Sequence, residues 1–434
     1  MLEILGILVF LGLVGFSIGL HEFGHFIPAK KFGVKVTEFA IGFGPTIFAK
    51  NFGETSFRLR ALPIGGFIRM IGMYLTSRND GKSDTGFFSS AITQAREESA
   101  KEILPTDKER VFYKLSVPKR LVIMSGGPFM NFILATVMFT IVLSVIGFQT
   151  PTTKVGEVIE CIPTEANPNG TLSKGKCQDS QPTPSSQMDL QVGDEFLQIG
   201  TKQIDEWFDF SKVLQKYEVG DIVSFQILRD GKVLNFQTKL AALRYEKYDQ
   251  NGKPTGKFGV RPFFGVAPEF KWQSQPVTDV PNYMWQFTKG SVESLMQFPT
   301  KIADLTYRMA TGKERDPNGP ISVVGVTRLS GEIAASDQSL RSKVQQILGM
   351  AASLNLFLFL FNLLPFLPLD GGHVAGALFE AARSKYAKMR GRQDLRPVDI
   401  ARMLPLTYLV SFLLLGAGLI VIVADAVAPI TLNS

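Results

Sequence analysis

The residues best suited to chemistry are His21, Glu22 and His25, in the pattern HEFGH. Residues i and i+4 of a helix share one face, so both imidazoles can bind one metal ion. Glu22 adjoins them and could take the proton of a metal-activated water, as in hydrolases with an HExxH motif. The chain has only 3 histidines, and this motif uses two of them. The pattern predicts a metal-assisted hydrolase with Glu22 as the general base.

A third metal ligand must come from elsewhere, because a catalytic zinc ion takes three protein ligands and keeps one position open. The segment NLLPFLPLDGGH, 362–373, offers Asp370 and, three residues later, His373. We favour Asp370, which should lie at the same membrane edge as the two histidines, and His373 stays an alternative. A His/His/carboxylate set suits Zn²⁺ but leaves other divalent metals open.

Four apolar segments are long enough, or nearly so, for a membrane span, which needs about 20 residues. They cover 4–20, 129–148, 347–366 and 404–427. The HExxH motif stands at the end of the first span, where ionisable side chains are costly and usually functional. In that span, Gly15 and Gly19 predict a close approach by another helix, and Glu22 shares the side of Gly15. The mean hydropathy of +0.13 suggests membrane helices combined with a water-exposed domain.

The distribution of basic residues predicts the orientation in the cell membrane. The loop 26–119 holds 15 Lys/Arg against 9 Asp/Glu, and 371–403 holds 7 against 3, whereas 149–290 holds 16 against 17. The two basic segments should therefore face the cytoplasm, so that the long connection and both termini are extracytoplasmic. The active site then lies near the cytoplasmic face. The net charge of +7 is modest and no basic run with interleaved aromatics occurs, which argues against nucleic-acid binding.

The long connection reads as a globular α+β module. VGEVIECIP at 155–163 alternates like a strand, a helix is expected near 206–217, and RDGK at 229–232 is an Asp-Gly hairpin turn. Residues 276–310 should be helical, whereas 311–345 is polar and interrupted by Gly and Pro. Cys161 and Cys177 flank a loop-like insertion and could form a disulfide outside the cytoplasm, or stay two unrelated thiols. In the cytoplasmic loop, 56–70 suggests a hairpin with Pro63 and Gly65-Gly66 in its middle.

Several motifs together resemble the site-2 protease family of membrane-embedded zinc metalloproteases. They are HEFGH, GGPFMNF (126–132) and NLLPFLPLDGGH, with IGFGP (41–45) and the hairpin 56–70 similar to the family's membrane re-entrant β segments. VGDEFLQIG and RDGK resemble a single PDZ domain. One such domain and ERDPNGPISVVG (314–325) look more like the actinobacterial branch than the enterobacterial regulator-of-sigma-E protease, which carries two.

The resemblance implies a role for each matching residue. His21, His25 and Asp370 match zinc ligands, Glu22 matches the catalytic base, and Asn362 matches an asparagine beside the substrate backbone. The strand Phe67, Ile68, Arg69 and Met70 matches an edge that pairs with unwound substrate, since an extended peptide can add to an open sheet edge. The insertion 161–187 departs from the PDZ pattern at its peptide-binding loop, which puts peptide capture in doubt. The module could then be a size filter or a spacer.

The implied fold class is a polytopic α-helical membrane protein with four transmembrane helices, re-entrant β segments and one extracytoplasmic PDZ-like α+β domain. The expected parts are span one with HExxH at 1–28, cytoplasmic loop 29–119, span two 120–149, PDZ-like domain 150–245, connecting region 246–345, span three with LDG 346–370, basic segment 371–403 and span four 404–428.

The implied activity is intramembrane cleavage of single-span membrane proteins. The resemblance points to anti-sigma factors already cut by an upstream site-1 protease, in regulated intramembrane proteolysis, and to remnant signal peptides. The alternative is a membrane metal-binding protein that uses its PDZ module as a scaffold without proteolysis. Glu22 favours the enzyme, because a metal holder needs no base.

Overall fold

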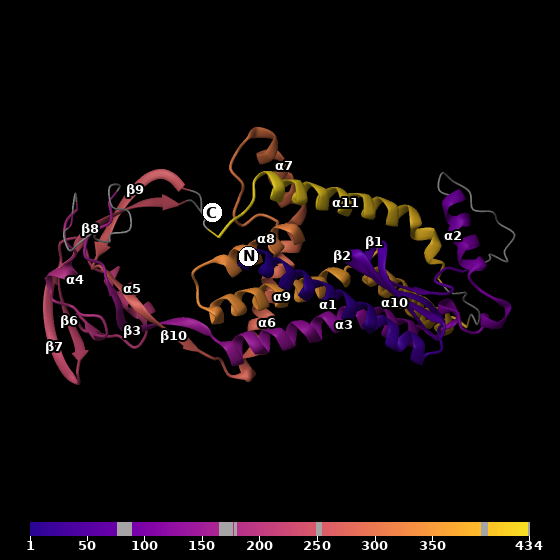
Figure 1. The fold of residues 1–434 in the computed structure, drawn as a ribbon, viewed down its shortest axis with the longest axis horizontal. Coiled ribbons are helices and arrows are strands. Elements are labelled where there is room, and N and C mark those ends of the chain that lie inside the picture. Colours follow the sequence, from indigo (N-terminus) through magenta and orange to yellow (C-terminus); the bar gives the residue numbers. More distant parts are fainter. Residues whose placement is uncertain (76–88, 165–176, 178–179, 249–253, 392–397, 433–434) are drawn as a thin grey trace. The chain divides into compact units, whose positions relative to one another are not determined.

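The chain forms two compact units in a computed structural model that describes residues 1–75, 89–164, 177, 180–248, 254–391 and 398–432 (Figure 1). The first unit contains 1–146 and 275–434, and the second contains 147–274. The second unit begins close to the predicted boundary at 150 but continues past 245. The reason is that the last strand of the unit, β10 (Val266–Gln273), pairs with its first, β3 (Phe148–Val158).

Four helices of the first unit are long and apolar enough to cross a membrane, as the sequence predicts (Figure 1). They are α1 (Leu2–Lys31), α3 (Val117–Thr140) with its continuation η3 (Ile141–Ile146), α9 (Leu340–Asn362), and α11 (Leu404–Val427) preceded by η5 (Ile400–Met403). Only a minority of each apolar window is buried inside the protein. The exposed apolar remainder is what a lipid-facing surface requires.

Glycine lets α1 pack closely against two neighbours. Its first turns contact α8 (Val323–Ala335) at Gly6, and its last turns contact α3 at Gly24. The prediction that another helix packs against Gly15 and Gly19 is wrong. A Cβ on Gly15 would meet open space, and one on Gly19 would meet only Ile41, which belongs to a strand. A small-xxx-small pair permits a close approach without saying where the neighbouring helix lies.

Between these two contacts an apolar core joins α1, α3, α8 and α9. Its buried members are Phe10, Val14, Met138, Ile333, Ile347, Ala351 and Ala352. Helix α8 lies inside 311–345, for which the sequence predicts a polar segment interrupted by Gly and Pro and no helix. Its 13 residues include Gly325 and Gly331, which weaken the helical pattern in the sequence.

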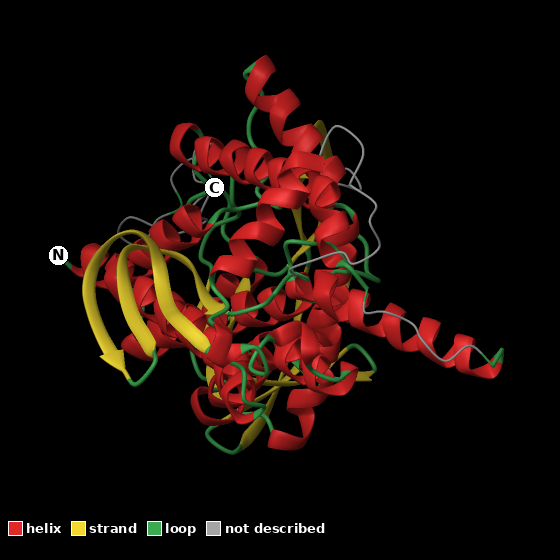
Figure 2. Cartoon of the chain, turned by 90° about the vertical axis from the view of Figure 1, so that its right-hand side faces the viewer, coloured by secondary structure: helices red, strands yellow, loops and turns green. Residues whose placement is uncertain are grey.

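A long, bent β hairpin lies beside α1. Strands β1 (Val36–Phe52) and β2 (Thr55–Met70) join at Gly53-Glu54, and Figure 2 shows the arching strands of this sheet side by side. The predicted hairpin centred on Gly65-Gly66 is therefore displaced: the turn comes earlier, at Gly53, whose φ is +60°. Residues 38–41 of β1 pair with 56–59 along one edge and with 66–69 along the other. The segment 66–69 consequently forms an outer edge, and no other described strand pairs with it.

Shorter helices complete the first unit. They are α2 (Ser89–Lys101), η1 (Pro105–Asp107), η2 (Phe112–Lys114), η4 (Val277–Asp279), α6 (Val280–Met296), α7 (Phe298–Thr311) and α10 (Asp370–Met389). Helices α6 and α7 confirm the helical prediction for 276–310. Helix α10 begins with Asp370, so the predicted ligand opens a helix directly after the segment 363–369, which contains two prolines and follows α9.

The second unit has a six-stranded sheet around an aromatic core. Along it run β10, β3, β4 (Glu195–Ile199), β6 (Ile222–Arg229) and β7 (Lys232–Lys239), with β5 (Lys202–Gln203) beside β4. The predicted turn joins β6 to β7, because Asp230 and Gly231 both take positive φ, as a tight two-residue hairpin requires. The predicted helix is α5 (Trp207–Leu214). A separate pair, β8 (Ala241–Tyr248) and β9 (Pro254–Phe263), and the short α4 (Pro184–Gln187) complete the unit.

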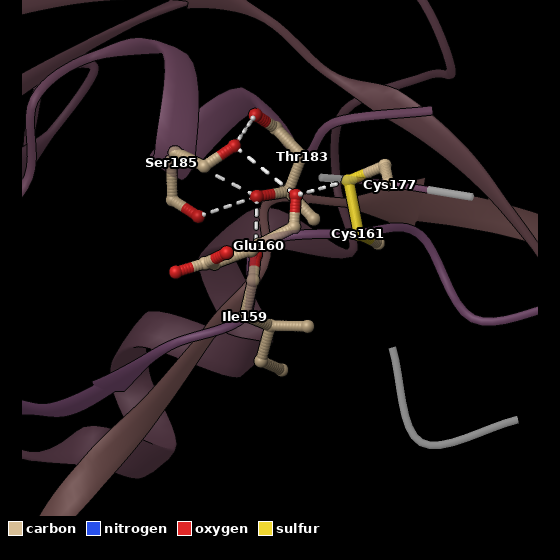
Figure 3. Close-up of a disulfide and its surroundings, with 7 residues drawn as sticks. Ile159, Glu160, Cys161, Cys177, Thr183 and Ser185 are labelled. Carbon is tan, nitrogen blue, oxygen red and sulfur yellow. Dashed lines mark hydrogen bonds between the residues drawn. A yellow bond between two sulfur atoms is a disulfide. The ribbon is translucent and has the colours of Figure 1, made fainter. Parts of the chain in front are cut away.

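Cys161 and Cys177 form a disulfide at the base of the insertion (Figure 3). Thr183 joins the two ends of the insertion through hydrogen bonds. Its backbone N–H donates to the carbonyl oxygen of Glu160 at 3.0 Å, and its hydroxyl donates to the carbonyl oxygen of Ile159 at 2.5 Å. Both thiols are therefore paired, as one of the two sequence-based readings expects.

Candidate metal centre

The three side chains expected to bind a metal lie together. His21 and His25 project from α1, and Asp370 comes from the first residue of α10. His21 Nε2 and His25 Nε2 are 3.3 Å apart, and each lies 3.3 Å from Asp370 Oδ2. Within the described part of the chain, His21, His25 and Asp370 are the one group of three or more His, Cys, Asp or Glu residues placed closely enough to hold a metal ion.

This triangle of atoms has the size that a tetrahedral ion demands. Ligand atoms about 2.0–2.1 Å from zinc, at tetrahedral angles, lie about 3.3–3.4 Å from one another. Each edge of the triangle measures 3.3 Å. The three donors therefore fit zinc while leaving a fourth position open. His373, the alternative third ligand, is not part of the group.

The imidazole of His25 is held in one tautomer by the backbone. Its Nδ1 lies 2.8 Å from the carbonyl oxygen of Ile123 in α3, so Nδ1 carries the proton and donates it. The lone pair of Nε2 is then directed at the metal position. A hydrogen bond of this kind fixes ring orientation and raises ligand basicity.

Asn131 of α3 can do the same for His21. Its side-chain amide lies 3.1 Å from His21 Nδ1, and its Oδ1 is buried without a hydrogen-bond partner. A His21 that binds metal through Nε2 carries its proton on Nδ1 and needs an acceptor there. Turning the amide by 180° meets both demands, since the orphan Oδ1 then accepts from Nδ1–H.

Three glycines make room for these groups. A Cβ on Gly24 of α1 would lie 2.2 Å from the Gly126 carbonyl oxygen, and one on Gly126 would lie 2.0 Å from that of Gly24. A Cβ on Gly127 would lie 2.2 Å from His25 Nε2 itself. The pair Gly126-Gly127 thus brings α3 against α1 and leaves free the ring nitrogen that faces the metal position.

Glu22 is buried beside the edge strand. It is 7% exposed, and a Cβ built on Gly66 of β2 would lie 2.9 Å from Glu22 Cγ. The backbone of the outer strand therefore passes directly over the candidate base. Of the residues that follow, Phe67 and Ile68 are half-buried, Arg69 is exposed and Met70 is buried.

The remaining predicted residue, Asn362, is the last residue of α9 and is half-buried. The structure does not bring it into the group of ligands. The motif GGPFMNF contains Gly127 and Asn131, but the sequence analysis gave neither residue a role at the site, and it gave none to Gly66. A polar asparagine in the apolar stretch 129–148 is a further signal that could have marked Asn131.

Asp370 completes the donor set with a carboxylate oxygen. The ionised carboxylate is the form that binds metal.

Comparison with known proteins agrees with this geometry. Residues 9–406 match peptidase family M50. The zinc metalloprotease Rip1 of Mycolicibacterium smegmatis is 31% identical over 442 residues, covering 99% of this chain and 98% of its own, and that of Mycobacterium tuberculosis H37Rv is 29% identical over the full length of both. The solved PDZ domain of an SdrC-like protein from Listeria monocytogenes aligns with 25% of this chain and 90% of its own, at 17% identity and a TM-score of 0.14, too low to support an argument. The family match covers most of the chain, which therefore belongs to peptidase family M50, the site-2 protease family of membrane metalloproteases.

Proposed function

We propose that His21, His25 and Asp370 hold a zinc ion and that Glu22 is the general base of an intramembrane endopeptidase. The observation that carries this assignment is the triangle of donor atoms with 3.3 Å edges next to a buried glutamate. When bound, zinc supplies a Lewis acid that polarises a peptide carbonyl and lowers the pKa of a water molecule.

Glu22 handles the proton in this scheme. Its carboxylate takes the proton of the attacking water and then delivers it to the departing amide nitrogen, as a general base that becomes a general acid. Its burial between α1 and β2 keeps bulk water away from the carboxylate. General acid–base catalysis of this kind contributes about 10²–10⁴-fold.

The outer edge of β2 is the proposed substrate site. Phe67, Ile68, Arg69 and Met70 follow Gly66, and an unwound substrate segment would add to this edge through backbone hydrogen bonds. The close approach of Gly66 to Glu22 supports the placement, because it puts an added strand next to the base. Asn362, at the end of α9, is proposed to bind the substrate backbone.

The proposed substrates are single-span membrane proteins, in particular anti-sigma-like regulators already cut by a site-1 protease, and remnant signal peptides. The requirement for unwinding favours a lone span, because a helix packed in a bundle is held closed by its neighbours. In the proposed topology α1, α3, α9 and α11 cross the cell membrane, β1 and β2 re-enter it from the cytoplasm, and both termini are outside.

The second unit is then an extracytoplasmic PDZ-like domain. Its paired cysteines fit an oxidising compartment. We propose that it limits the size of the outer part of a substrate, because the insertion closed by Cys161 and Cys177 stands where a PDZ domain would hold a peptide.

Comparing membrane proteomes tests this proposal. Cells that carry Glu22→Gln should accumulate single-span fragments trimmed on their outer side, relative to the parent. The matched control is Glu3→Gln, which changes an exposed carboxylate in the first turn of the same helix. Equal fragment levels in the parent and in Glu22→Gln cells would refute the assignment.

A further inference from the structure

Helix α10 presents an apolar face to the outside of the first unit. Leu378, Phe379, Tyr386 and Met389 are 53%, 62%, 55% and 78% exposed. At about 100° per residue these four side chains lie within an arc about 100° wide. Four large apolar groups on one arc of a helix form a continuous surface, unlike apolar residues scattered singly.

The opposite side of α10 is packed. Ala377 and Ala387 are buried, and Glu380 forms an ion pair with the buried Arg120 of α3 and accepts a 2.8 Å hydrogen bond from the Val398 backbone N–H. These contacts fix how the helix is rotated about its axis. The apolar arc therefore points outward, and no other described element packs over it.

Basic side chains border the arc. Lys385 and Arg390 are exposed, and each lies about 20° beyond one of its two edges. The Arg390 guanidinium lies 4.6 Å from the centre of the Tyr386 ring, so it extends along the arc. Lys388 is exposed about 130° from the middle of the arc, on the far side. An apolar strip with a cation along each edge is typical of a helix lying in a membrane interface.

The chain holds α10 close to one face of the bilayer. Helices α9 and α11 are both candidate spans, so the segment 363–399 between them leaves and re-enters the membrane on the same face. The segment is fixed near both ends, by Asp370 in the ligand group and by the bond from Val398 to Glu380. Figure 1 places α10 beside α3. The arc is thus a neighbour of the lipid-facing surface of the spans.

We propose that this arc of α10 docks into the headgroup layer of a membrane containing anionic phospholipid. Leu378, Phe379, Tyr386 and Met389 would enter the boundary between headgroups and acyl chains. Lys385 and Arg390 would keep their stems along the apolar boundary and bring their charges to phosphate groups. This inference goes beyond proteolysis, and it stands whether or not Glu22 is the base.

Spin labels on the full chain test the docking without any cleavage assay. The two native cysteines are paired, so a label at Leu378→Cys or Met389→Cys reports on one site. In nanodiscs of phosphatidylcholine with one quarter phosphatidylglycerol, both labels should be accessible to oxygen, which concentrates in lipid, and shielded from a water-soluble nickel complex. A label at Lys388→Cys should show the reverse. Labels at 378 and 388 with equal exposure to the nickel complex would overturn the proposal, as would a label at 378 shielded from both reagents, which would indicate a protein partner.

Charge neutralisation tests the lipid class. Lys385→Gln and Arg390→Gln should each shift the balance between shielded and exposed label at 378 about fivefold toward exposure, the effect of about 1 kcal/mol per basic residue near an anionic surface. The matched control, Lys388→Gln, should shift it less than twofold. Pure phosphatidylcholine discs should resemble the double neutralised variant. Equal shielding in neutral and anionic discs would overturn the preference for anionic lipid.

Discussion

At its first turns α1 packs on α8, at its last turns it packs on α3, and both contacts run backbone to backbone through glycine. A Cβ on Gly6 would lie 2.6 Å from the Ser330 carbonyl oxygen, and one on Gly24 would lie 2.2 Å from the Gly126 carbonyl oxygen. Beside Gly6 lies the hydroxyl of Ser330, which donates to the backbone carbonyl oxygens of Gly6 and Thr327. Beside Gly24 the polar groups are two imidazoles that share a carboxylate.

One end of α1 only packs against its neighbour, whereas the other end also positions the metal ligands. At the α8 end, the close contact packs α1 against a helix whose N-cap residue hydrogen-bonds to Asp425 of α11. At the α3 end, the same closeness lets Ile123 and Asn131 reach the far nitrogens of His25 and His21. Changes at the first end should therefore alter stability alone, and changes at the second should alter metal binding first.

The largest expected effect is at Gly127. Gly127→Ala places a Cβ 2.2 Å from His25 Nε2, too close for van der Waals contact, and the hydrogen bond to Ile123 opposes rotation of the ring away from it. Zinc binding by the purified protein should be abolished, as measured by metal content after dialysis. The control is Gly6→Ala, which should lower the melting temperature and keep one zinc per chain. Full zinc content in Gly127→Ala would contradict this account of the α3 end.

The next effect concerns stability at the α8 end. Arg315 and Asp425 form a buried ion pair at 2.6 Å, and Asp425 also accepts a 2.7 Å bond from the Ser322 backbone N–H at the start of α8. Arg315→Met leaves Asp425 buried without its cation, which costs about 3–5 kcal/mol. Unfolding in detergent should show this loss, while the folded fraction keeps its zinc. A folded Arg315→Met protein without zinc would contradict the expectation that changes at the α8 end of α1 affect stability alone.

A smaller effect is expected at Asn131. Asn131→Leu removes the acceptor for His21 Nδ1–H, and loss of such a partner weakens metal affinity about 10–100-fold. Asn131→Asp should restore most of it, because a carboxylate also accepts that proton. Competition with a zinc chelator measures both.

The control for Asn131 is Asn355→Leu. Asn355 is a buried asparagine of α9 that donates to Ser17 Oγ at 2.9 Å, one helical turn before His21 and outside the ligand group. Its replacement should leave zinc affinity unchanged. If Asn131→Leu and Asn355→Leu weaken zinc binding equally, the polar contact to His21 is not the cause.

The smallest effect is a pH dependence near the end of α1. Hydrogen bonds from Arg110, together with Lys30 of α1, lower the pKa of Glu54 to about 2 from an ordinary value of 4.5. Because the folded pKa is depressed, the stabilisation is complete above about pH 4.5 and is lost as the pH falls through about 2. The group is partly exposed, so the contribution should stay below about 1 kcal/mol.

Glu54→Gln should flatten this part of the curve of unfolding free energy against pH. Glu109→Gln, which changes a carboxylate that is 86% exposed, should not. An unchanged curve in Glu54→Gln would show that the cluster is not formed in the folded protein.

The sequence predicted that His21, His25 and Asp370 come together, because the two histidines are four residues apart on one helix and Asp370 follows a recognisable helix end. It could not predict Gly127 or Gly66, since their role depends on which backbone crosses His25 and Glu22 in space. The expectation for Gly15 failed for the same reason. Helix α8 was missed because its two glycines look locally like interruptions, although Gly331 packs on α1 and Gly325 lies against Asp425 of α11. Local periodicity thus gives the elements, while contacts between them must come from the structure.

Glu22 is proposed to move the proton at a metal site to which it contributes no ligand. The most direct measurement is cleavage of a purified single-span substrate in proteoliposomes, with zinc content determined on the same samples. For Glu22→Gln we expect one zinc per chain and a cleavage rate lower by at least about 100-fold, while Glu3→Gln should cleave like the parent. A Glu22→Gln protein that binds zinc and cleaves at the parental rate would contradict this role.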